Sequence, residues 1–252
     1  MAGTKRLDTL LVERSLAADI DEAQRLIGAG LVQVNDHLVD KAGQQVRQDC
    51  QLRIKAVRRY VSRGGDKLEA ALHAFSLDLH GFICADIGAS TGGFTDCLLQ
   101  HGAARVYSVD VGYGLLAWKL RTDPRVIVRE RVNARYLNKE QIPEPIDLAV
   151  IDASFISATL LFPPLFPLFA HIIRLLVLVK PQFQLSKDKV AEGGIVRDQQ
   201  LRDEAVAMVQ EFAASRGLSC AQPFACPVHG AKGNQEFFLY LTRTQKEEQV
   251  HE

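Results

Sequence analysis

The chain has 252 residues, 47% of them hydrophobic, and its 30 basic side chains balance 30 acidic ones. This size suits one large domain beside a small one, and the net charge of zero gives no argument of its own for nucleic-acid binding. The five cysteines show no Cys-x-x-Cys spacing, which argues against a disulfide framework or a zinc site and predicts a cytoplasmic protein with no metal.

Residues 1–57 have the pattern of a small α+β domain. Leucines recur at helical spacing over 7–11, and Asp19 can cap a second helix that stops at a glycine. Short apolar runs on either side of an Asn-Asp pair predict a hairpin over 31–39, and one further strand is expected at 51–55. So short a segment buries little surface, so we expect this domain to present a binding surface.

The stretch 58–64 is basic, ends at the first of two consecutive glycines, Gly64-Gly65, and is predicted to link the two domains. From 65 to 246, apolar strands alternate with helices, which predicts a doubly wound α/β sheet with helices on both faces. We expect seven strands, the last of them antiparallel, and a disordered tail at 247–252. The clearest strands are Ile83–Ile87, Val106–Asp110, Val126–Arg129, Leu148–Ile151, Leu175–Val179 and Phe237–Leu241, and the longest helix is Gln199–Ser215.

The most apolar window, Leu160–Val179, does not have the pattern of a membrane span. It contains three prolines together with His171 and Arg174, which interrupt or charge any spanning helix. We interpret it as a short helix followed by a buried strand, and we expect no membrane partner.

A glycine-rich turn opens the large domain, in the sequence Asp86-Ile87-Gly88-Ala89-Ser90-Thr91-Gly92-Gly93-Phe94. The next strand ends at a carboxylate, Asp110, which can accept both hydroxyls of a ribose, while glycines let backbone amides approach the ligand. The spacing is not Gly-x-Gly-x-x-Gly, so a dinucleotide fits poorly and S-adenosylmethionine fits better. The alternative is an ordinary strand–turn–helix connection. The predicted cofactor contacts in this region are Asp86, Gly88, Ser90, Gly92 and Asp110.

Charged side chains also stand at the ends of later strands. Asp152 and Lys180 each follow an apolar strand, and Glu236 begins the last one, where an antiparallel strand reaches the same ligand edge. Lys67, on the helix before the first strand, is placed to complete the set. An uncharged lysine amine can take a proton from a hydroxyl. The alternative for Lys180 alone is a strand-end lysine whose amine reaches solvent, and the alternative for Glu236 alone is a surface salt bridge.

With these residues, the chain resembles the TlyA family of ribosomal RNA 2′-O-ribose methyltransferases, often labelled hemolysins. The large domain is similar to the FtsJ class of methyltransferases, which have a Rossmann-like sheet, and the small domain resembles the RNA-binding module of the ribosomal-protein S-four type. The matching segments cover nearly the whole chain and include Arg6-Leu7-Asp8, Ala23-Gln24-Arg25-Leu26-Ile27, Ser62-Arg63-Gly64-Gly65-Asp66-Lys67-Leu68, the Asp86–Phe94 turn, Asp152 with Ser154-Phe155-Ile156-Ser157, Val179-Lys180-Pro181-Gln182-Phe183 and Gly233-Asn234 with Glu236-Phe237.

The resemblance implies a catalytic Lys-Asp-Lys-Glu tetrad at Lys67, Asp152, Lys180 and Glu236, in which Lys180 is the general base. It also implies that Asn133 lies near the adenine of S-adenosylmethionine. The implied substrate is a cytidine ribose in ribosomal RNA within ribosomal subunits, and DNA is not an expected partner. The linker matches the segment that couples the two domains in this family.

Basic side chains of the small domain and linker are the predicted RNA contacts. The second helix opens with acidic residues at 19, 21 and 22, where the module usually carries a basic residue, and carboxylates repel phosphates, although Asp19 serves equally as a helix cap. Two other functions stay open, a membrane-active hemolysin and an RNA-binding ribosome assembly factor without catalysis. The predicted RNA contacts are Lys5, Arg6, Arg25, Arg47, Arg58, Arg59 and Arg63.

Overall fold

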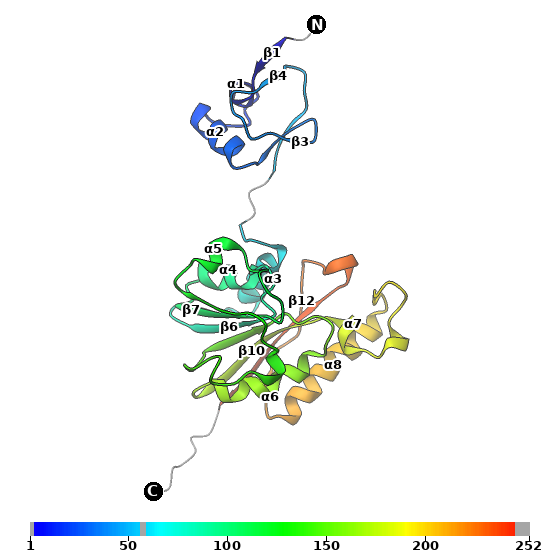
Figure 1. The fold of residues 1–252 in the computed structure, drawn as a ribbon. Helices are drawn as coiled ribbons and strands as arrows, with labels where there is room; N and C mark the ends of the chain where they lie inside the picture. The colour runs from blue at the N-terminus through cyan, green and yellow to red at the C-terminus, as the bar shows by residue number, and fades with distance from the viewer. Residues whose placement is uncertain (1–2, 56–58, 245–252) are drawn as a thin grey trace. The chain divides into compact units, whose positions relative to one another are not determined.

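The chain divides into two compact units, residues 1–58 and 59–252, in a computed structural model that describes residues 3–55 and 59–244 (Figure 1). Each unit has a hydrophobic core of its own. The predicted tail at 247–252 and the predicted contact Arg58 lie outside the described residues.

The first unit has two helices and two small sheets. Asp19 caps α2 as predicted, because its side chain accepts a hydrogen bond from the Glu22 amide at 2.7 Å. Asn35 and Asp36 both have positive φ, +49° and +63°, which is the twist that a two-residue hairpin needs. The elements are β1 (Thr4–Arg6), α1 (Leu7–Glu13), α2 (Ile20–Gly28), β2 (Val32–Val34), β3 (His37–Leu38), β4 (Gln45–Arg47) and β5 (Leu52–Ile54), with sheets β3-β2-β5 and β1-β4.

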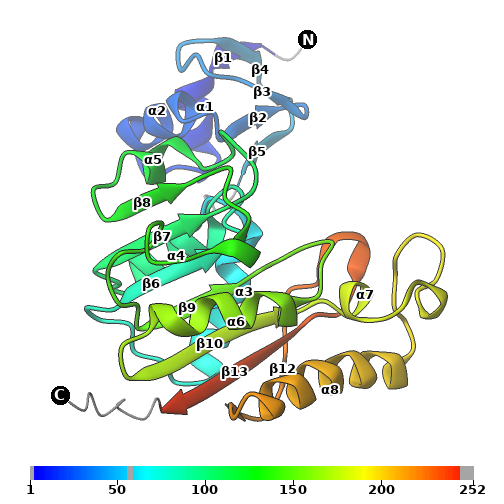
Figure 2. The ribbon, with the colours of Figure 1, turned by 60° about the horizontal axis from the view of Figure 1, so that its bottom comes forward.

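The second unit is built on one mixed sheet. Five strands are parallel, and β13 runs antiparallel between β10 and β11, as Figure 2 shows for β13 beside β10. The short strands β11 and β12 both pair with β13, so the described sheet has eight strands where we predicted seven. In spatial order the strands are β11 (Ser219–Cys220), β13 (Phe237–Thr244), β10 (Ile172–Val179), β9 (Leu148–Ile151), β6 (Ile83–Ile87), β7 (Arg105–Val109) and β8 (Val126–Arg129), with β12 (Phe224–Ala225) also on β13.

Helices cover both faces of this sheet, as predicted (Figure 1). The alternation along β9 shows why, since Leu148 and Val150 enter one core while Ala149 and Ile151 enter the other. The helices are α3 (Arg63–Ala74), α4 (Gly93–Gln100) and α5 (Trp118–Arg121) on one face, α6 (Phe162–Leu165) and α8 (Gln199–Ser215) on the other, and α7 (Pro181–Gln184) after β10; short 3-10 turns lie at Ala134–Tyr136, Ala158–Leu161, Phe166–Leu168, Lys187–Lys189 and Ala231–Gly233.

The predicted linker 58–64 is only partly a connection. Tyr60 is buried in a core of the second unit, where a Cβ on Gly65 would overlap its ring, and α3 already begins at Arg63. The Val61 amide donates a hydrogen bond to Asp96 of α4 at 2.8 Å. These contacts make residues 60–64 part of the second unit, because the ring of Tyr60 is buried in its core.

The apolar stretch 160–179 forms short helical turns followed by β10, as predicted. Across residues 3–55 and 59–244, no helix combines the length and the apolar character needed to cross a membrane.

Candidate functional site

A cavity of about 440 Å³ opens at the carboxyl ends of β6, β7 and β9. Its polar wall includes Gly88, Ser90, Asp110 and Asn133, four of the predicted cofactor contacts. Its volume lies in the range of small-molecule sites. The sequence motif and the sheet topology therefore converge on one pocket.

The turn after β6 needs glycine at position 88. Gly88 has φ +90°, and a Cβ there would stand 2.5 Å from the carbonyl oxygen of Asp152. The turn therefore touches the loop that follows β9, which brings the predicted cofactor motif close to Asp152. Ser90 also has a positive φ, +49°, and its amide points to Asp110.

Asp110 is held rigidly at the end of β7. Its two carboxylate oxygens accept hydrogen bonds from the amides of Ser90, at 2.8 Å, and Gly112, at 2.7 Å. A carboxylate has about four acceptor sites, so two stay available for ribose hydroxyls. Asn133 lies on the same cavity wall, and its side-chain oxygen accepts a hydrogen bond from the Arg135 amide at 3.1 Å.

Two predicted cofactor contacts do not line this cavity. Asp86 is fully buried, and its carboxylate accepts a hydrogen bond from the Thr95 hydroxyl at 2.7 Å. Strand alternation explains the difference, because Ile87 faces the cavity and Asp86 faces α4 instead. Burial raises the pKa of Asp86 to about 7.

Gly92 has φ +94° and ends the turn at the start of α4. A Cβ there would overlap the side chain of Leu120 and stand 2.7 Å from that of Leu116. Glycine at this position therefore serves the backbone turn and helix packing, and a contact between Gly92 and the cofactor stays a prediction.

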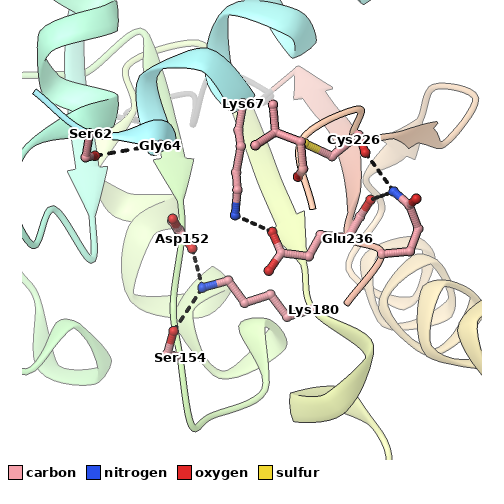
Figure 3. Close-up of polar contacts among 10 residues, drawn as sticks. Ser62, Gly64, Lys67, Asp152, Ser154, Lys180, Cys226 and Glu236 are labelled. Carbon is pink, nitrogen blue, oxygen red and sulfur yellow. Dashed lines mark hydrogen bonds and ion pairs between the residues drawn. The ribbon is translucent and has the colours of Figure 1, made fainter. Parts of the chain in front are cut away.

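The four charged residues of the predicted tetrad meet beside the cavity (Figure 3). Lys67 Nζ donates to Glu236 Oε2 at 2.6 Å, and Lys180 Nζ lies 2.5 Å from Asp152 Oδ1. The side chains of Lys67, Lys180 and Glu236 are 11%, 10% and 3% exposed. Because buried charges are costly without partners, each lysine is matched with one carboxylate.

Sheet topology brings these residues together from distant segments. β10 and β13 are antiparallel neighbours with Val179 opposite Phe237, so the residue after one strand, Lys180, adjoins the residue before the other, Glu236. Asp152 follows the neighbouring parallel strand β9. Lys67 reaches the group from α3.

The residues before Glu236 in the sequence pack closely around its side chain. A Cβ on Gly230 would overlap the Glu236 carboxylate, so only glycine leaves room for it. Asn234, 2% exposed, accepts a hydrogen bond from the Val196 amide at 2.9 Å and donates one to the Gly194 carbonyl at 2.7 Å. These bonds tie the segment before Glu236 to the loop before α8.

Sequence reasoning missed two residues at this site. Ser154 lines the cavity and accepts a hydrogen bond from Lys180 at 2.9 Å. Phe155 also lines it, with φ +68°, a side chain 87% exposed and a ring centroid 5.1 Å from that of Phe183. A single serine has no spacing pattern that would mark it as a site residue. An exposed phenylalanine is recognised as one only when the structure shows that it lines the cavity.

Most of the predicted RNA contacts in the described residues have acidic partners. Arg6 holds the pKa of Asp8 down to about 2 through a hydrogen-bonded ion pair. Arg63 is exposed. The pairs are Lys5–Glu13, Arg6–Asp8 at 2.6 Å, Arg47–Asp49 at 2.7 Å and Arg59–Glu69, while Arg25 donates to the Asp21 carbonyl at 3.3 Å.

One group of possible metal ligands occurs among the described residues, although none was predicted. Donor atoms of Glu69, His73 and His101 lie within 4.8 Å of one another. Arg59 already pairs with Glu69, and His101 Nδ1 lies 2.9 Å from the Cys97 carbonyl oxygen. The guanidinium of Arg59 therefore competes with any cation for this carboxylate.

Two family models match the chain. Residues 60–243 match the FtsJ-like methyltransferase model, and residues 5–49 match the S4 domain model. The two matches fall within the second and the first compact unit.

Curated relatives cover nearly the whole chain. The 16S/23S rRNA (cytidine-2′-O)-methyltransferase TlyA of Mycobacterium tuberculosis is 45% identical over 97% of this chain and 92% of its own length. Hemolysin A of Brachyspira hyodysenteriae is 38% identical over 94% of this chain and 99% of its own length. A solved hemolysin-named structure from Streptococcus thermophilus superposes with a TM-score of 0.73 and 39% identity, covering 98% of this chain and 90% of that one.

Proposed function

The chain belongs to the TlyA family of FtsJ-like methyltransferases, and we propose that it methylates the ribose 2′-hydroxyl of a cytidine in ribosomal RNA within ribosomal subunits. The observation that carries this proposal is the pairing of Lys67 with Glu236 and of Lys180 with Asp152 beside one cavity. The relative from Mycobacterium tuberculosis is an rRNA (cytidine-2′-O)-methyltransferase, which supports the choice of nucleotide.

The residues that line the cavity suit S-adenosylmethionine in their chemistry. Asp110 and Ser90 offer hydrogen-bonding groups at one wall, and Val111, Leu115 and Val132 offer an apolar wall that suits a purine ring. We propose that Gly88, Ser90, Asp110 and Asn133 hold the cofactor. When bound, it supplies a methyl group on a positively charged sulfur.

Lys180 is proposed as the general base. Its nitrogen lies at the edge of the cavity, where an acceptor hydroxyl approaching the methyl group can give up its proton. Asp152 lines the cavity and pairs with the lysine, and the Lys67–Glu236 pair lies next to them, as Figure 3 shows. Because these groups hold the hydroxyl in line, positioning accounts for much of the expected rate enhancement.

We propose that residues 1–57 bind the RNA through basic side chains. The S4 model match over residues 5–49 supports this, and the exposed guanidinium groups of Arg6 and Arg47 are available at the surface. The Arg47–Asp49 pair is local and solvent-accessible on both sides, so a phosphate can replace the carboxylate of Asp49 at small cost.

The two alternatives have less support. A membrane-active protein needs an apolar segment that enters the bilayer, and no described helix is suited to span one. An inactive assembly factor has no reason to keep two buried lysines matched with two carboxylates.

The test is methyl transfer from labelled S-adenosylmethionine to purified small subunits, large subunits and naked ribosomal RNA. We expect label on ribosomal RNA with the native chain and a loss of about 1000-fold with Lys180→Ala, while calorimetry shows donor binding intact. Lys139→Ala, which removes an exposed lysine of the same unit, is the control and should keep full activity. Full activity of Lys180→Ala would disprove the proposed base.

A further inference from the structure

The position of the Lys180 amine is set by two acceptors on one loop. Lys180 Nζ lies 2.5 Å from Asp152 Oδ1 and 2.9 Å from Ser154 Oγ, and Figure 3 shows both contacts converging on the nitrogen. The two acceptors are separated by a single residue after β9. The lysine is 8% exposed, so it has little room to rotate away from them.

A lysine nitrogen has four tetrahedral positions. One is its own carbon, and the uncharged amine fills the others with two N–H bonds and one lone pair. Ser154 accepts one N–H, and the Asp152 carboxylate lies against the nitrogen as its ion partner. The lone pair of Lys180 then cannot point at Ser154, and the negative charge of Asp152 disfavours a lone pair on its side of the nitrogen.

The loop that carries Ser154 is fixed against the segment that carries Lys180. Phe155 turns the backbone with φ +68°, and its ring lies 5.1 Å from that of Phe183, three residues after Lys180. Ser154 lines the cavity and accepts the hydrogen bond from Lys180, so it connects the lysine to the cavity wall. The ion pair with Asp152 alone would leave the amine free to turn about the Lys180–Asp152 contact.

We propose that Ser154 is a positioning residue of the methyl transfer, which orients the Lys180 lone pair toward the acceptor hydroxyl. As the hydroxyl oxygen bonds to the methyl carbon, the bond between that carbon and the donor sulfur breaks and its electron pair stays on sulfur. The hydroxyl proton moves to this lone pair, and the resulting ammonium later returns the proton to water. Asp152 stabilises the ammonium that forms, and Ser154 supplies the direction. This inference rests on the proposed role of Lys180 as base.

The experiment compares Ser154→Ala with Ser154→Thr, which keeps a hydroxyl at the same carbon. We expect Ser154→Ala to lower kcat about tenfold or more and to leave the KM and Kd for S-adenosylmethionine within about twofold. Ser154→Thr should recover most of the lost kcat. A general loss of structure would change donor binding and kcat together.

Ser157→Ala is the matched control, because this serine lies on the same loop and its hydroxyl contacts Gln184 and Thr159. It should keep kcat within about twofold of the native value. Lys180→Ala is measured in parallel, so that failure of the base and failure of the serine can be told apart. The inference is wrong if Lys180→Ala is inactive while Ser154→Ala keeps full kcat, or if Ser154→Thr is as slow as Ser154→Ala.

Discussion

The two units pair their charges in different ways. In the first unit, Arg6 pairs with Asp8 and Arg47 with Asp49, so each partner lies two residues along the chain. In the second unit, Lys67 pairs with Glu236 across 169 positions, and both side chains are almost wholly buried. The first arrangement can form in a short peptide, and the second exists only in the complete fold.

This difference separates a binding surface from a catalytic centre. Exposed local pairs are worth at most about 1 kcal/mol, so a phosphate can take a carboxylate's place without disturbing the fold. Breaking a buried pair leaves an unmatched charge and costs about 3–5 kcal/mol. Stability and activity should therefore be coupled in the second unit and independent in the first.

Glu236→Gln should produce the largest effect. Its replacement leaves the Lys67 ammonium buried without a charge partner, so we expect the free energy of unfolding to fall by about 3 kcal/mol and the transfer rate to fall roughly 100-fold. Urea unfolding and labelled methyl transfer measure the two losses. Arg125→Gln, which breaks the more exposed pair with Asp123, should cost less than about 1 kcal/mol. Equal losses of unfolding free energy in Glu236→Gln and Arg125→Gln would contradict the distinction between buried and exposed ion pairs.

Asp86→Asn tests a buried carboxyl whose Oδ1 has no hydrogen-bond partner among the described residues. Burial raises its pKa from 3.8 to about 7, so between these values the folded chain holds a proton that the unfolded chain has lost. The free energy of unfolding therefore falls as pH rises through this window. From pH 5 to pH 8 the native chain should lose about 2 kcal/mol more than the asparagine variant. Urea unfolding at both pH values measures these losses. An equal loss of unfolding free energy in the native chain and in Asp86→Asn would contradict the prediction.

Arg47→Gln should have the smallest effect on folding. We expect the free energy of unfolding to change by less than about 0.5 kcal/mol, RNA affinity to fall about threefold and the salt dependence of binding to weaken by roughly one counterion. Asp49→Asn should act in the opposite direction, because it releases Arg47 from its partner. Salt titrations of RNA binding measure both, and a weaker affinity in Asp49→Asn would argue against a phosphate contact at Arg47.

Local patterns predicted the elements that depend on local chemistry. The bounds of α8 follow from Asp198, whose side chain accepts a hydrogen bond from the Gln200 amide and starts the helix where apolar spacing also begins. By contrast, β1 and β4 are three residues each and pair across about 40 positions, so neither has a period that a sequence window can detect.

The site was predictable to the extent that strand ends determine it. Lys180 and Asp152 were placed correctly beside each other because each follows a parallel strand. Asp86 does not line the cavity, because a motif does not say which residues of a strand face it. Ser154 was missed because its proposed role depends on one hydrogen bond from Lys180, and the sequence around Ser154 does not indicate that bond.

The antiparallel pairing of β13 with β10 also makes the charged cluster depend on a different part of the sheet from the cavity. Glu236 precedes β13, whereas the cavity residues Gly88 and Asp110 follow β6 and β7. Separating β13 from the sheet would therefore take Glu236 away from Lys67 and would leave β6 and β7 paired with each other. A change at one strand can in this way uncouple the proposed catalytic cluster from the proposed donor site.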